Sequence, residues 1–286
     1  MEKIPCFIKK RISFNENFIS TERLIKAYKV NTICKSANCP NIYECFSKKY
    51  VSFMILGNIC TRNCKFCSVE KGIPEKLDKD EPERIASIVK KLNMRYVVIT
   101  SVTRDDLEDG GAGQFAEVVK KIREKSPETK IEVLIPDFSG KIENLKIIFD
   151  SKPDIISHNI ETVKSLYPLI RPLADYKTSL KVLSEVKKNK FITKSGFMVG
   201  LGEEEDEIYQ LMNEILKAGC DIIVVGQYLK SSSHGWEVKK FYNEEFFKKI
   251  EEYGLKIGFR KVFASIFYRT SYIAEKEPPR GFEPRT

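Results

Sequence analysis

Apolar residues in this chain gather in short, β-branched runs, and stretches of helical periodicity separate these runs. The runs predict strands at residues 51–56, 96–100, 131–135, 154–158, 192–199 and 222–229. Apolar side chains spaced three and four residues apart predict helices at residues 82–92, 114–125, 142–149, 176–188 and 204–217. Strands that alternate with helices indicate parallel βαβ units with right-handed crossovers.

Six strands are too few for a closed eight-fold barrel, so the pattern fits a partial six-unit barrel or an open doubly wound sheet. In both architectures the loops at the C-terminal ends of the strands form the site. These loops read GNICTRNCKFC, SVTRDDLEDGG, HNIET and GLGEEED after the first, second, fourth and fifth strands. The sequence shows no internal repeat. The tail, EPPRGFEPRT, is rich in proline and charge, and we expect it to be disordered.

The net charge of +9 has two readings that the sequence leaves open. A solvated, lysine-rich surface explains it, and so does a basic face that steers an acidic protein partner. No helix-turn-helix, zinc-finger or RNP pattern points to nucleic acid. No apolar run approaches the ~20 residues that cross a bilayer, and the N-terminal residues do not resemble a signal peptide. We therefore expect a cytoplasmic protein that binds neither membrane nor nucleic acid.

Six of the eight cysteines fall within a short stretch near the N-terminus. Cys60, Cys64 and Cys67 form a C-x3-C-x2-C run directly after the first predicted strand. Three closely spaced thiolates can hold three irons of a cubane cluster, which leaves the fourth iron open to an exogenous ligand. This spacing, with Phe66 before the last cysteine, resembles the signature of the radical S-adenosylmethionine (SAM) superfamily. The resemblance implies that SAM chelates the open iron and that the backbone of Phe66 lies near its adenine.

A second run, C-x4-C-x5-C, lies upstream at Cys34, Cys39 and Cys45 and could hold three irons of another cubane. Its position before the first motif resembles lipoyl synthase, which implies an auxiliary [4Fe-4S] cluster that donates sulfur. That family takes a fourth cluster ligand from a serine in a C-terminal Arg-Ser-Ser-Tyr motif. The matching stretch here is Arg-Thr-Ser-Tyr, in which Thr270 replaces the first serine and Ser271 keeps the ligand position. A hard oxygen ligand fits a cluster that is dismantled during turnover.

The resemblance to lipoyl synthase covers roughly residues 25 to 276 and includes FMILGNICTRNCKFC, RYVVITSVTRDDLEDGGAGQFAEVV and TKSGFMVGLGE. It implies a partial (β/α)6 barrel of the radical SAM type with N- and C-terminal extensions. We expect an N-terminal extension at residues 1–48, a core at residues 49–258 and a C-terminal extension at residues 259–286.

The resemblance also implies a reaction. A 5′-deoxyadenosyl radical removes hydrogen from C6 and C8 of an octanoyl chain, and sulfur is inserted at both positions. The chain is attached to a lysine of a carrier domain, so the substrate is a protein. Two [4Fe-4S] clusters and SAM are the implied cofactors. An electron donor such as ferredoxin or flavodoxin and an iron–sulfur cluster supplier are the further partners. No catalytic side chain beyond the cluster ligands is expected.

Residues for SAM are expected in the loops after the strands. By position and resemblance, Asn159 could hydrogen-bond the ribose or carboxylate, while Gly200 and Gly202 could let the backbone approach the adenosyl group. Lys194 could meet a carboxylate or be a surface lysine. The acidic turn at residues 104–106 lies where the superfamily contacts the methionine amine. His158 is either a histidine packed at a strand end or part of the site.

Four alternatives are weighed against this resemblance. Structural zinc needs four closing ligands, and each cysteine group here supplies three. A disulfide framework does not fit a large chain with such closely clustered thiols. Another sulfur-inserting radical enzyme, similar to biotin synthase or a methylthiotransferase, and a non-enzymatic metal carrier are the competing functions. Cys220 is expected to be a buried, inert thiol, and Cys6 has no assigned role.

Overall fold

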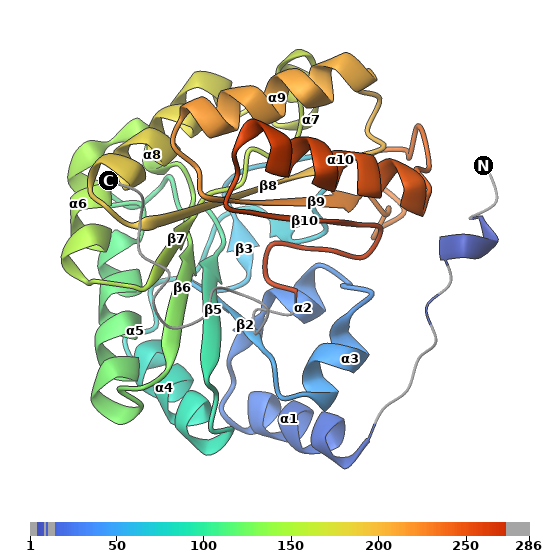
Figure 1. Cartoon of the computed structure of the whole chain (residues 1–286). Coiled ribbons are helices and arrows are strands. Elements are labelled where there is room, and N and C mark those ends of the chain that lie inside the picture. The colour runs from blue at the N-terminus through green and yellow to red at the C-terminus, as the bar shows by residue number, and fades with distance from the viewer. Residues whose placement is uncertain (1–4, 9, 11–14, 273–286) are drawn as a thin grey trace.

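The computed structural model describes residues 5–8, 10 and 15–272, so the tail expected to be disordered lies outside the described residues. Its centre is one sheet with the strand order β1-β2-β5-β6-β7-β8-β9-β10 (Figure 1). Strand β1 pairs antiparallel with β2, and every other neighbouring pair in this sheet is parallel. The strands are β1 (Asn31–Thr32), β2 (Ser52–Ile55), β5 (Tyr96–Ser101), β6 (Lys130–Leu134), β7 (Ile155–Ser157), β8 (Ile192–Val199), β9 (Ile222–Gln227) and β10 (Lys261–Ser265).

All six predicted strands are confirmed, and the structure adds β1 and β10 to them. Strand β10 was not predicted from the sequence, because a long polar segment separates β9 from the helix and strand that follow it. Helix α10 (Glu244–Ile257) follows that segment and packs its buried face against β10. The β10 strand extends the sheet by one parallel strand beyond the six units.

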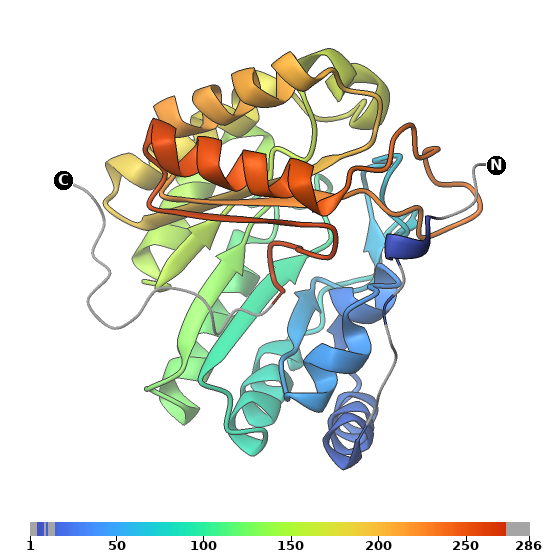
Figure 2. The ribbon, with the colours of Figure 1, turned by 45° about the vertical axis from the view of Figure 1, so that its right-hand side comes forward.

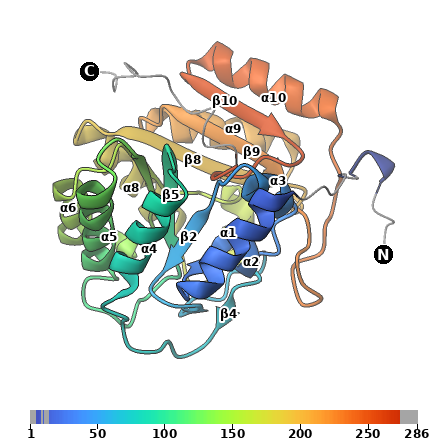
Figure 3. The ribbon, with the colours of Figure 1, turned by 90° about the horizontal axis from the view of Figure 1, so that it is seen from below.

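Helices cover the outer face of the curved sheet, as Figure 3 shows from below. The five predicted helices are confirmed with small shifts of their ends, as α4 (Glu81–Lys91), α5 (Ala112–Lys125), α6 (Ile142–Asp150), α8 (Tyr176–Lys188) and α9 (Glu205–Lys217). Local chemistry sets their starts. Asp175 accepts a hydrogen bond from the N–H of Thr178 at 2.7 Å and caps α8. A reciprocal capping box between Glu204 and Glu207 begins α9.

Several short elements were not predicted from the sequence. They are α1 (Glu16–Ala27), α2 (Ile33–Ser36), α3 (Ile42–Ser47), α7 (Tyr167–Ile170), η1 (Cys6–Ile8), η2 (Phe138–Gly140), η3 (Lys164–Leu166), β3 (Ile59–Cys60) and β4 (Glu70–Lys71). Most are shorter than the window over which periodicity can be read. None of the helices in the described ranges is long and apolar enough to cross a bilayer.

The sheet does not close into a barrel. Figure 2 shows α2, α3 and the segment after β10 lying between its two edges. Asn41 donates from Nδ2 to the carbonyl of Phe267 at 2.7 Å, and the Tyr272 hydroxyl donates to Glu44 at 2.7 Å. Chain segments from opposite ends therefore bridge the opening. The predicted partial barrel is confirmed, while the division at residues 48 and 258 stays a prediction.

Candidate functional site

A pocket of about 410 Å³ lies in the opening of the partial barrel. Its lining includes the whole upstream cysteine triplet, the hydroxyl predicted to complete it, and several neighbours: Cys34, Cys39, Cys45, Ser52, Tyr96, Val98, Arg269, Ser271 and Tyr272. The structure therefore brings together four predicted ligands from opposite ends of the sequence. Their role as ligands stays a prediction.

Two short helices present the upstream cysteines. The hydroxyl of Thr32 accepts a hydrogen bond from the N–H of Lys35 at 3.3 Å and caps α2, which carries Cys34. The N–H of Cys39 then donates to the carbonyl of Cys34 at 3.0 Å, which turns the chain back toward the pocket. Cys45 sits on α3 and donates from its N–H to the carbonyl of Asn41 at 2.9 Å. Local hydrogen bonds thus fix the three cysteine backbones.

The thiols of this pocket are suited to a cationic group. Burial, together with the neighbouring thiols, raises the pKa of Cys34 and that of Cys45 to about 12. Thiolates so placed repel one another and lack hydration, so they need positive charge beside them. Iron ions supply that charge, and coordination deprotonates thiols outright. The donor set therefore fits an iron–sulfur cluster.

A clamp of polar side chains holds the two chain ends over this pocket. Glu44 on α3 pairs with Lys10 at 2.8 Å and accepts the hydrogen bond of Tyr272. Partial burial raises the pKa of Glu44, but hydrogen bonds from Lys10, Tyr272 and Lys48 outweigh it and lower that pKa to about 2. An ionised Glu44 thus joins the N-terminal segment to the residue that follows Ser271.

Cys60 ends strand β3, and Cys64 and Cys67 lie in the loop that joins β3 to β4. The two strands pair in parallel as a two-strand ribbon. The sulfur of Cys60 accepts hydrogen bonds from the N–H groups of Arg62 and Thr103, each at 3.4 Å. Burial raises the pKa of Cys67 to about 11 and also raises that of Cys64. Desolvated thiolates need positive charge beside them here as well, so this triplet also fits an iron–sulfur cluster.

Arg62 anchors the downstream loop to two neighbouring strand ends. Its guanidinium binds Asp105 through two hydrogen bonds of 2.8 Å and Asp137 through two of 2.6 and 2.7 Å. Burial raises the pKa of Asp137, yet Arg62 outweighs it and lowers that pKa to about 2. Bidentate pairs of this kind fix geometry as well as energy. The acidic turn predicted to meet SAM therefore contacts the cysteine loop through Asp105.

Phe66 and the glycine loop after β8 meet in one apolar cluster. Phe66 and Trp236 pack against a buried cluster of Ile170, Leu201 and Tyr228. The N–H groups of Gly200, Leu201 and Gly202 donate to the carboxylate of Glu203 at 2.6, 2.9 and 3.1 Å.

Both glycines of this loop have positive φ, +99° at Gly200 and +118° at Gly202. A Cβ on Gly200 would lie 2.2 Å from Nε2 of Gln227. The positive φ and the close approach of Gln227 therefore explain why residue 200 is a glycine. The expected approach of the adenosyl group to this loop stays a prediction.

The side chain of Asn159 makes two hydrogen bonds. Its Nδ2 donates to Glu161 at 3.0 Å, and its Oδ1 accepts from the hydroxyl of Thr270 at 2.9 Å. The threonine that departs from the family motif thus uses its hydroxyl to tie the Ser271 segment to the loop after β7. A separate hydrogen bond, from the Ser68 hydroxyl to the carbonyl of Ser36 at 2.9 Å, joins the residue after Cys67 to helix α2, which carries Cys34.

Arg171 and Glu161 were missed by the sequence analysis. Arg171 is buried and Glu161 is half-buried, and the positive charge of Arg171 acts on both Cys64 and Glu161. Burial raises the pKa of Glu161, although Arg171 and Asn159 oppose this. Arg171 follows a four-residue helix that has no readable periodicity, so no local pattern marks it.

Lys194 is not a surface lysine, which corrects one of the two expectations for it. Its side chain is fully buried inside the barrel, and Nζ pairs with Glu132 at 3.0 Å. Glu132 also accepts hydrogen bonds of 2.5 Å from Tyr96 and from Ser157. The carboxylate that Lys194 meets therefore belongs to the chain, and a contact with SAM stays a prediction. His158 packs at the strand end, where Nδ1 contacts the carbonyl of Ile135 at 2.9 Å.

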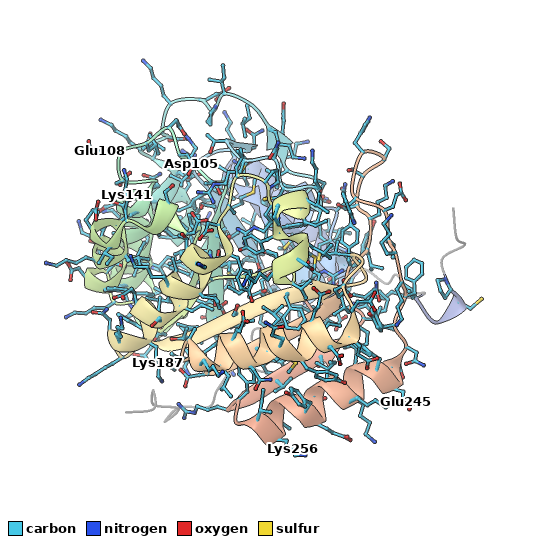
Figure 4. All side chains as sticks on the ribbon, turned by 90° about the horizontal axis from the view of Figure 1, so that it is seen from above. Asp105, Glu108, Lys141, Lys187, Glu245 and Lys256 are labelled. Carbon is cyan, nitrogen blue, oxygen red and sulfur yellow. The ribbon has the colours of Figure 1, made fainter. Side chains whose placement is uncertain are left out.

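A shallower pocket of about 290 Å³ lies on the loops after β5 and β6. Figure 4 shows its residues Asp105, Glu108 and Lys141 together at one edge, away from Lys256 of α10. In the described part of the chain, no three His, Cys, Asp or Glu side chains converge on a single ion position. A cubane does not require such convergence, because each thiolate binds a different iron.

Comparisons with known proteins agree with this geometry. The Radical SAM superfamily matches residues 54–215. A lipoyl synthase of Caldicellulosiruptor saccharolyticus is 48% identical over 276 residues, which is 96% of this chain and 97% of that protein. A lipoyl synthase of Phocaeicola vulgatus is 44% identical over 274 residues, or 96% of each chain.

Among solved structures, methylornithine synthase superposes with a TM-score of 0.57 at 15% identity and covers 92% of this chain and 85% of its own. Streptococcus suis SuiB bound to S-adenosylmethionine gives a TM-score of 0.58 at 14% identity, over 94% of this chain and 70% of its own. These two likenesses show the fold alone. The sequence identity over nearly the whole length shows the family: the chain belongs to the lipoyl synthase family of the radical SAM superfamily.

Proposed function

We propose that this protein inserts sulfur at C6 and C8 of an octanoyl chain on a lysine of a carrier domain, which produces the lipoyl group. The observation that carries this proposal is the pair of separate cysteine triplets in one barrel, with Ser271 in the pocket of the upstream triplet. An enzyme with a single cluster needs only the downstream triplet. A second set of thiols with an oxygen donor supplies a place for a sacrificial sulfur source.

The two donor sets have separate tasks. Cys34, Cys39, Cys45 and Ser271 would hold the auxiliary cluster, and Cys60, Cys64 and Cys67 would hold the cluster that binds SAM. When bound, the downstream cluster supplies the electron that cleaves SAM to methionine and a 5′-deoxyadenosyl radical, and the auxiliary cluster supplies the sulfur.

The remaining contribution of the chain is to position these groups and to exclude water. Arg62 fixes the downstream loop through its two aspartates, and two backbone N–H groups orient the sulfur of Cys60. Arg171 places a buried positive charge beside Cys64. Phe66, Asn159, Gly200 and Gly202 form the surroundings proposed for the adenosyl group.

A carrier domain that presents its octanoyl-lysine to the opening of the barrel is the proposed protein substrate. A net charge of +9 favours an acidic partner through electrostatic steering. An electron donor and an iron–sulfur cluster supplier complete the proposed set of partners.

The test starts with anaerobic reconstitution of the full chain. About eight irons per chain, with matching sulfide, are expected from two four-iron clusters. Mass spectrometry of an octanoylated carrier domain after turnover should then show two added sulfurs. Bound zinc, or turnover of SAM without added sulfur, would contradict the proposal.

Substitution of the proposed oxygen ligand separates the two sites. Ser271→Ala should lower sulfur insertion more than it lowers 5′-deoxyadenosine formation, because only the auxiliary site loses a ligand. Ser20→Ala, on the exposed face of α1, is the matched control and should change neither activity. Equal loss of both activities in Ser271→Ala would show that the sites are not separate in the way described.

A further inference from the structure

The tip of α7 exposes apolar side chains beside the downstream cysteine loop. Leu169 is 56% exposed and Leu173 is 58% exposed, and Pro172 between them is also exposed. Ile170, by contrast, is fully buried and belongs to the cluster against which Phe66 packs. The helix therefore turns one residue inward to the site and leaves its neighbours in solvent. Exposed apolar residues grouped in this way are typical of an interaction surface.

This tip is bonded directly to the cysteine loop. The N–H of Lys65 donates to the carbonyl of Ile170 at 2.9 Å, and Lys65 stands next to Cys64 in the sequence. The N–H of Cys67 donates to the carbonyl of Cys64 at 3.2 Å, so the loop is compact where the helix touches it. A single hydrogen bond and one peptide unit thus join the α7 tip to a proposed cluster ligand.

The polar rim of this surface includes exposed lysines, although Asp175, two residues after Leu173, is exposed as well. The side chain of Lys65 is exposed, and its carbonyl accepts a hydrogen bond from the N–H of Trp236 at 2.9 Å. The segment that follows Trp236 exposes Lys239 and Lys240. Glu237 is exposed in the same segment, and Lys230 pairs with it. An apolar centre with a rim of lysines complements an acidic protein.

We propose that the α7 tip, formed by Leu169, Pro172 and Leu173 with Lys65 at its rim, is the docking surface for an acidic ferredoxin that reduces the enzyme. This inference rests on the proposed function. The ferredoxin would be oxidised by one electron, and the cluster that Cys60, Cys64 and Cys67 would hold would be reduced by one, without transfer of a proton or an atom. The route through Ile170 and Lys65 gives this electron a short, bonded path from the protein surface.

The octanoylated carrier domain is the competing occupant of this surface, and the geometry disfavours it. The acyl chain has to reach the auxiliary pocket, and α7 and residues 60–67 contribute nothing to the lining of that pocket. A reductant has only to approach the downstream triplet, which is what the α7 tip borders.

The test uses the reconstituted full chain with the double substitution Leu169→Asp and Leu173→Asp. A two-cluster ferredoxin is the probe, and its dissociation constant is measured by calorimetry at low salt. We expect binding to weaken at least tenfold, because the two carboxylates remove the apolar centre and repel the acidic partner. Formation of 5′-deoxyadenosine driven by reduced ferredoxin should fall to the same extent, while formation driven by dithionite should be unchanged. Leu255→Asp on α10, at a leucine that is 50% exposed, is the control and should bind ferredoxin normally.

Three results would overturn this inference. Ferredoxin that binds the double variant as it binds the wild type shows that it docks elsewhere. Loss of the dithionite-driven reaction as well shows that the leucines support the site itself. Weaker binding of the octanoylated carrier domain, with ferredoxin binding intact, assigns the surface to the carrier. Sulfur insertion by the wild type with dithionite tests the proposed function separately, because that assay does not involve the α7 tip.

Discussion

Removing the buried charge of Lys194 should destabilise the protein strongly, because it leaves a carboxylate inside the barrel without its cation. Lys194 and Glu132 are both fully buried and lie 3.0 Å apart. Breaking a buried pair from one side costs about 3–5 kcal/mol. The hydrogen bonds from Tyr96 and Ser157 remain and keep the carboxylate partly satisfied. We therefore expect Lys194→Met to lower the free energy of unfolding by about 3–4 kcal/mol.

The second step of this test removes the carboxylate charge as well. The double variant Lys194→Met/Glu132→Gln places two neutral groups of similar size in the same space. Buried pairs replaced on both sides are often nearly neutral in stability, so most of the loss should be recovered. The two single variants and the double variant form a cycle that gives the coupling energy of the pair.

The assay is urea unfolding of the reconstituted protein under anaerobic conditions, followed by circular dichroism. For a slope of ~3 kcal/mol per molar urea, the loss in Lys194→Met corresponds to a shift of about 1 M in the midpoint. A shift below about 0.3 M would show that the pair contributes little. A double variant that is as unstable as the sum of the two single variants would also refute the reasoning.

Three further predictions follow from other contacts. Arg62→Lys should speed the removal of iron from the downstream site by a chelator roughly 10–100-fold, as is typical when a group that orients a ligand is lost; Arg84→Lys, in an ion pair with the exposed Asp78, should not. Burial, with the charge of Arg171 nearby, lowers the pKa of His158 in the folded protein to about 4. In the unfolded chain this histidine takes up its proton near pH 6.5. The free energy of unfolding should therefore be unaffected by His158 above about pH 6.5 and should fall as the pH drops toward 4. Urea midpoints between pH 7.5 and 5 should show this fall, His158→Asn should reduce it, and the exposed His234→Asn should leave it intact. Gly200→Ala should lower the melting temperature more than Gly57→Ala. Both glycines have positive φ, so the backbone strain of the substitution is shared. Only at residue 200 does the added Cβ also clash with atoms of Gln227 and Lys240.

The strands and long helices could be predicted from the sequence because their signals are local. The β-branched run of β9 and the apolar face of α8 can be recognised within a few residues. The cysteine triplets were equally accessible, since their spacing is itself the motif. Strand β10 was not predicted, because a polar segment separates β9 from α10 and β10.

The electrostatic frame of the site could not be predicted in this way. Arg62 meets Asp105 and Asp137, which are 43 and 75 residues away, only after three loops assemble at one edge of the sheet. Lys194 likewise pairs with Glu132, 62 residues away, because the two side chains point from β8 and β6 into the barrel interior. Such pairs depend on the tertiary fold, so no periodicity or motif reveals them.

The clamp between α3 and the segment after β10 affects the order in which the protein matures. Ser271 and Tyr272 follow β10 in the sequence and are translated after it, whereas the downstream triplet precedes β5. The loop proposed to bind SAM is therefore synthesised long before the residues that complete the lining of the upstream pocket. Under the proposed function, the auxiliary site is complete only once Ser271 has been made, so a chain cut just before Ser271 should keep SAM cleavage and lose sulfur insertion.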